Sequence, residues 1–115
     1  IIQPNRHTTL FDEVITKTAQ WGTANNLMFV VGATQANLLE HIRTLVPNHF
    51  LLVPGVGFQG GSLQQVTQYG RNAEVGLLVN VSRAIIYASE GENFAEEAAA
   101  IAQQYQVEMA SYLQA

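Results

Sequence analysis

The fold is decided by residues 50–62, which read FLLVPGVGFQGGS. The first four residues form an apolar run that predicts a buried strand, and Pro54-Gly55 ends it. Four glycines then fall within eight residues, and Ser62 is placed to cap a short helix. The stretch therefore predicts a strand that leads through a glycine-rich turn into a helix.

The same alternation of strand and helix continues on both sides of this stretch. Apolar runs predict further strands over 27–31, which has no polar interruption, and over 77–81, which contains Asn80. Apolar residues at helical spacing predict helices over 9–21 and 38–46, a helix that Gly70 ends, and a last helix opened by a capping box of Asn93 and Glu96. Residues 84–87 fit either an extension of the third strand or one helical turn capped by Ser82. Trp21 and the tyrosines of the last helix fit packing positions.

Strands that alternate with helices imply right-handed crossovers and a parallel sheet. Three strands with both faces buried leave two uncovered edges, so the pattern predicts part of a larger sheet. A (β/α)8 barrel needs about 250 residues, or roughly 31 per unit. The 115 residues of this chain supply between three and four such units and cannot close a barrel alone.

Composition excludes several classes of protein. A hydrophobic fraction of 48% with a formal net charge of −4 excludes a disordered chain, and the lack of cysteine excludes disulfide frameworks. The apolar runs are shorter than the ~20 residues of a membrane span, and no basic patch suits nucleic acid. The chain begins with Ile1 and carries no targeting segment, so we expect a fragment.

The glycine-rich turn is the strongest candidate for a binding site. Exposed backbone N–H groups beside the start of a helix favour an anion, and Gln59 adds a neutral donor. The turn lacks the lysine of a Walker A loop and the spacing of a dinucleotide fingerprint. It therefore predicts a phosphate loop, with an ordinary strand-to-helix turn as the alternative.

Arg83 follows the third strand and is suited to a bidentate phosphate contact. In a barrel, the loops after the last two strands frequently form the phosphate site, which fits this position. The alternative is a solvated arginine paired with a glutamate of the acidic tail. Thr34 lies at the end of the first strand. For this residue, a helix cap is favoured over a contact with a ligand.

No metal site or catalytic acid/base pair is predicted. His7, His41 and His49 lack metal-ligand spacing, and His41 is expected to face solvent. Asp12 is expected to favour the dipole of the first helix, and Lys17 to lie on its solvent face.

Three strand ends, residues 30–34, 52–61 and 78–88, resemble consecutive strand ends of orotidine 5′-monophosphate decarboxylases, above all the longer bacterial branch. The resemblance runs from about Leu10 to the C-terminus. It implies an α/β fold in which this chain is the C-terminal part of a (β/α)8 TIM barrel, its last three strands and their helices. It further implies a cytoplasmic, homodimeric lyase without a cofactor, which converts orotidine monophosphate to uridine monophosphate.

The resemblance also implies the roles of individual residues. The substrate phosphate would be held by Gln59, Gly60, Ser82 and Arg83. The base and ribose would lie near Thr34 and Pro54. Residues 1–115 would then be a single segment of a barrel, with its phosphate-binding part at 54–88.

The chain departs from the family in its catalytic residues. The Asp-x-Lys-x-x-Asp motif of the family is missing, since Asp12 and Lys17 are the only aspartate and the only lysine. We therefore expect no catalytic residue in this chain and an absent N-terminal half of the barrel. Alternatives are a relic without activity, another phosphosugar enzyme of the same superfamily, and a non-catalytic phosphate-binding module.

Overall fold

The computed structural model describes residues 9–57 and 61–113 and confirms the alternation of strands and helices. The elements in chain order are α1 (Leu10–Ala19), β1 (Phe29–Val30), the short 3-10 helix η1 (Ala33–Gln35), α2 (Asn37–Leu45), β2 (Leu51–Val53), α3 (Leu63–Gly70), β3 (Leu77–Val79), α4 (Arg83–Ile86) and α5 (Phe94–Leu113). The part of the chain that was open to either a strand or a helical turn is thus the helix α4.

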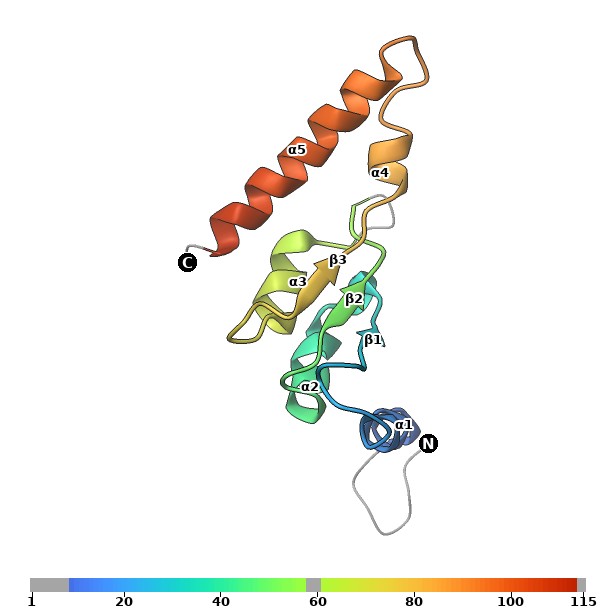
Figure 1. Ribbon diagram of the computed structural model, residues 1–115. Coiled ribbons are helices and arrows are strands. Elements are labelled where there is room, and N and C mark those ends of the chain that lie inside the picture. Colours follow the sequence, from blue (N-terminus) through green and yellow to red (C-terminus); the bar gives the residue numbers. More distant parts are fainter. Residues whose placement is uncertain (1–8, 58–60, 114–115) are drawn as a thin grey trace.

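The three strands form one parallel sheet in the order β1-β2-β3, as the alternation predicts (Figure 1). Two rows of paired residues cross it, Phe29, Leu51 and Leu77 in the first and Val30, Leu52 and Leu78 in the second. Successive side chains of a strand point to opposite faces, so the two rows lie on opposite faces of the sheet.

One face of the sheet carries the hydrophobic core. The row that contains Leu51 faces the helices, and Leu51 itself is fully buried. Helices α2 and α3 supply much of the rest of this core, and Ile15 of α1 adds to it. The largest fully buried side chains are Leu39, Ile42, Val46, Leu51, Val53 and Val66.

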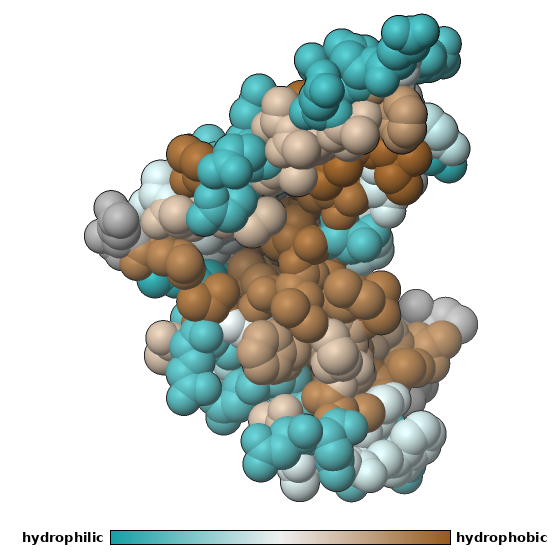
Figure 2. Space-filling model, turned by 45° about the horizontal axis from the view of Figure 1, so that its top comes forward, coloured by the Kyte–Doolittle hydropathy of each residue, from teal (hydrophilic) through white to brown (hydrophobic). Residues whose placement is uncertain are grey.

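The opposite face of the sheet is uncovered. The side chains of Val30 and Leu78 are 67% and 50% exposed, so the expectation of strands buried on both faces is wrong for this chain. Within the described residues, no second layer packs on that row. Figure 2 shows hydrophobic residues gathered over the middle of the molecule. The uncovered face is therefore as apolar as a protein core, but no described residue packs over it.

The helix ends agree with the sequence in part. Ser62 caps α3 as predicted, because its Oγ accepts a hydrogen bond from the Gln65 amide at 3.3 Å. The predicted capping box between Asn93 and Glu96 does not form. The Asn93 side-chain oxygen accepts a hydrogen bond from Ser89 Oγ at 2.7 Å instead. Trp21 is also wrongly predicted to pack: α1 ends at Ala19, and the indole is 73% exposed.

Arg43 ties together the amino-terminal side of the sheet. From α2, its guanidinium donates to four backbone carbonyl oxygens, those of Val46, His49, Gly70 and Gly76, at 2.5 to 3.1 Å. Partial burial lowers the pKa of Arg43 from its usual range. The side chain therefore joins α2, the end of α3 and the start of β3.

Candidate functional site

The carboxyl ends of the three strands lie next to one another, held by backbone hydrogen bonds. After β1, the Ala33 amide donates to the Pro54 carbonyl at 2.9 Å. After β3, the Asn80 amide donates to the Val53 carbonyl at 3.0 Å. The structure therefore brings the segments that contain Thr34, Pro54 and Arg83 to one edge of the sheet.

The glycine turn has the backbone conformation that explains its composition. Gly55 and Gly57 have φ values of 89° and 87°, which residues with a side chain rarely adopt. The Gly57 amide donates to the Gly61 carbonyl at 2.9 Å, and the Gly61 amide donates to the Gly55 carbonyl at 3.0 Å. A β-carbon at Gly61 would overlap the Gly55 carbonyl and Ala33, so the turn packs directly on the end of β1.

Two of the predicted phosphate ligands, Gln59 and Gly60, lie outside the described residues. Gly57 and Gly61 lie on either side of them, and the hydrogen bond between these two glycines fixes the two ends of the turn.

Ser82 and Arg83 lie where β3 passes into α4. The Ser82 carbonyl accepts from the Ile86 amide at 2.8 Å and so begins the helix. Its hydroxyl caps no helix and accepts instead from Asn80 Nδ2 at 3.2 Å. The predicted cap is therefore wrong, because Ser82 has helical backbone dihedrals and not the extended ones of a capping serine. Asn80 is a site neighbour that sequence reasoning missed.

The Arg83 side chain is exposed. Among the described residues it forms no ion pair, so the alternative of a pairing with a tail glutamate is not what the structure shows. A guanidinium without a protein partner retains all five N–H donors for a ligand.

Thr34 lies exposed in η1. The expectation that it caps a helix is wrong, since η1 begins after Gly32 and α2 after Ala36, neither with a side-chain cap. Thr34 lines instead a groove of about 290 Å³ at the outer edge of β1, with Phe11 and Leu38 on the helix side. Pro54 is half-buried, and its carbonyl belongs to the backbone link between β1 and β2.

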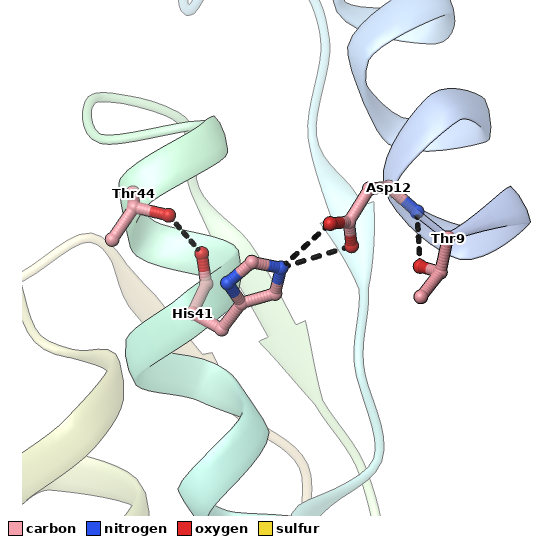
Figure 3. A network of polar contacts seen from close by, with 4 residues as sticks. All are labelled: Thr9, Asp12, His41 and Thr44. Carbon is pink, nitrogen blue, oxygen red and sulfur yellow. Dashed lines mark hydrogen bonds and ion pairs between the residues drawn. The ribbon is translucent and has the colours of Figure 1, made fainter. Parts of the chain in front are cut away.

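A pair of ionisable residues that the sequence did not predict lies in the helix layer (Figure 3). His41 Nε2 on α2 lies 2.9 and 3.0 Å from the two carboxylate oxygens of Asp12 on α1. Asp12 is buried, and the His41 side chain is half exposed, so His41 faces solvent as expected while its Nε2 contacts Asp12. The two residues are 29 positions apart, and no spacing signal connects them. They join two helices and lie outside the strand-end site.

In the part of the chain that the structure describes, no three histidine, aspartate or glutamate side chains gather as a metal site. Over the same residues, no helix is long and apolar enough to cross a membrane.

Comparison with known proteins places the chain in a family. No family model matches it. An orotidine 5′-phosphate decarboxylase of Phocaeicola vulgatus is 56% identical over 100 residues, covering 87% of this chain and 37% of the relative. The corresponding protein of Bacteroides fragilis is 53% identical over 106 residues, covering 92% and 39%. The chain thus spans about two fifths of the length of the curated relatives that it matches.

A solved structure extends the likeness to the fold. The orotidine monophosphate decarboxylase of Leishmania donovani superimposes with a TM-score of 0.67 at 27% identity, over 93% of this chain and 40% of that one. The expected architecture, part of a TIM barrel, is therefore confirmed. The chain is a segment that belongs to the orotidine 5′-phosphate decarboxylase family.

Proposed function

We propose that this chain is the phosphate-binding part of an enzyme that converts orotidine monophosphate to uridine monophosphate and CO₂. The names of its relatives support the activity. The observation that carries the proposal is the position of Arg83. This exposed arginine opens α4 at the sheet edge where the glycine turn also lies, and it has no ion-pair partner in the described residues.

Within the proposed site, two groups of residues act on different parts of the substrate. Its phosphate is held by Gln59, Gly60, Ser82 and Arg83, in a binding segment over 54–88. Its base and ribose lie near Thr34 and Pro54. A guanidinium binds a phosphate through two parallel N–H bonds, which fixes direction as well as distance.

These contacts contribute to catalysis although they are remote from the bond that breaks. Binding energy from the phosphate holds the pyrimidine ring in place, and so lowers the barrier at the distant carbon. The ammonium that stabilises and protonates the developing carbanion comes from outside this chain. Lys17 is exposed on α1, and Asp12 is bonded to His41, so neither serves the strand-end site. We propose that the 115 residues alone are inactive.

The whole enzyme is proposed to be a cytoplasmic homodimer that uses no cofactor. Its partner is a small nucleotide, and we propose no binding to nucleic acid or to a membrane. The N-terminal half of the barrel would supply the catalytic strand.

The experiment uses the longer protein with this segment and follows the absorbance of orotidine monophosphate without added metal. Wild type should consume the substrate. Arg83→Ala should lower kcat/KM at least about 100-fold, since a lost bidentate contact of ~3 kcal/mol corresponds to that factor.

Lys17→Ala is the matched control, because it removes another exposed cation and should leave kcat/KM unchanged. A wild-type protein that leaves orotidine monophosphate intact but acts on a different phosphosugar would contradict the proposal.

A further inference from the structure

Tyr105 is the side chain that α5 directs at the glycine turn. A β-carbon on Gly57 would overlap the Tyr105 hydroxyl oxygen and would lie 3.4 Å from the Cβ of Ala84. The hydroxyl of an α5 residue, 48 positions along the chain, thus occupies the space between the turn and α4.

The Tyr105 ring is held on its other side by apolar residues. It is half-buried and lines a groove of about 380 Å³ with Val79, Ile85 and Met109. Figure 1 shows α4 beyond the carboxyl end of β3, and α5 running back alongside α4 towards α3. The ring also packs against the hydrophobic core, so its hydroxyl lies where the glycine turn meets the start of α4.

The hydroxyl has no hydrogen-bond partner in the described part of the chain. Buried tyrosines usually use the hydroxyl in such a bond. Tyr112, seven residues further along the same helix, does so: its hydroxyl donates to Glu108 Oε2 at 2.6 Å, and this bond raises its pKa. Tyr105 instead places its oxygen against backbone.

We propose that Tyr105 is a positioning residue, whose hydroxyl sets the spacing between the glycine turn and α4. Arg83 is the first residue of α4, next to Ala84. The spacing therefore decides whether the backbone of the turn and the guanidinium reach one phosphate together. The proposal rests on the phosphate site proposed above, and it gives α5 a part in that site.

The test compares two substrates in the longer protein, orotidine monophosphate and orotidine, which lacks the phosphate. Tyr105→Phe should lower kcat/KM for orotidine monophosphate roughly tenfold, since a misplacement of about 1 Å can cost up to ~100-fold. It should leave kcat/KM for orotidine unchanged. Tyr112→Phe, on the same helix but bonded elsewhere, should change neither value. Equal losses for both substrates would indicate a purely structural role and overturn the proposal.

A double-mutant cycle tests the contact itself. Gly57→Ala should lower activity and melting temperature in wild type, because its β-carbon meets the Tyr105 oxygen at a φ of 87°. The loss should be smaller in the Tyr105→Phe background, where the oxygen is gone and only the backbone strain remains. Additive losses would mean that the two residues do not interact, which contradicts the proposal.

A binding measurement separates this inference from the proposed reaction. Inorganic phosphate should raise the melting temperature of wild type more than that of Tyr105→Phe, whether or not orotidine monophosphate is consumed. A protein without decarboxylase activity would overturn the reaction alone. Equal shifts in the two proteins would overturn the role of Tyr105.

Discussion

At the scale of single residues, the structure separates side chains that hold the fold from those that remain open to a ligand. Arg43 and Arg83 are both arginines near a helix end, yet they differ in their partners. Arg43 donates to four carbonyl oxygens, whereas Arg83 is exposed and has no ion pair in the described residues. The contrast assigns a structural role to Arg43, and it leaves the Arg83 guanidinium open for the phosphate contact proposed above.

Loss of the four hydrogen bonds of the Arg43 guanidinium should destabilise the protein. Arg43→Ala leaves several partly buried carbonyls without a donor, so the free energy of unfolding should fall by about 3 kcal/mol or more. Arg43→Lys should recover only part of this, because an ammonium lacks the planar fork. Arg71→Lys is the comparison, since Arg71 donates to a single carbonyl, that of Tyr112, at 2.6 Å. Denaturant unfolding of the longer protein measures these values, and equal losses at both positions would contradict the assignment.

The contact between Asp12 and His41 should contribute less. Asp12→Ala removes the acceptor of a half-exposed pair, so we expect a loss of about 1 kcal/mol in the free energy of unfolding. His41→Ala should give a similar loss, and the double variant should lose no more than either single variant because the pair acts as a unit. Thermal unfolding of the three variants measures these losses. Fully additive losses would show that the two residues act independently.

At the scale of elements, the sequence predicted what depends on local pattern. Apolar runs located all three strands, and Ser62 located the start of α3. Contacts between distant residues were missed, because no periodicity encodes them. Asp12 meets His41 across 29 positions, and Gly57 meets Tyr105 across 48. Residues 84–87 were undecided because four apolar residues fit both a strand and a helical turn.

For the candidate site, too, the sequence predicted the positions of residues along the chain but not all of their side-chain contacts. The positions of Pro54 and Arg83 after strands follow from the sequence order, and the parallel sheet brings those positions to one edge. The predicted cap by Ser82 was wrong because its backbone is helical where a capping serine is extended. The dihedral angles of a single residue between a strand and a helix are not encoded in the sequence pattern.

At the scale of the whole molecule, the uncovered face of the sheet is the dominant feature. Val30 and Leu78 are exposed in a row that also contains Leu52, and the chain spans about two fifths of its relatives' length. Exposed apolar surface of this kind marks a place where other protein packs. We infer that the face becomes the interior of the completed barrel, where layers of apolar side chains form the core.

A charge on this face should therefore have opposite effects in the two forms of the protein. Leu78→Lys should reduce self-association of the isolated 115 residues, because it interrupts an exposed apolar row. The same change should destabilise the longer protein by several kcal/mol, at least ~3, since it buries an unpaired charge. Sedimentation and thermal unfolding measure the two effects, with Gln65→Lys on the exposed side of α3 as the control. Tolerance of Leu78→Lys in the longer protein would contradict a buried position.

A crystal structure of the longer protein with uridine monophosphate bound would show directly whether this chain supplies the phosphate site of the enzyme. We expect the phosphate within about 3 Å of the Arg83 guanidinium nitrogens, beside the turn that runs from Gly55 to Gly61. A phosphate bound elsewhere, with Arg83 directed into solvent, would contradict it.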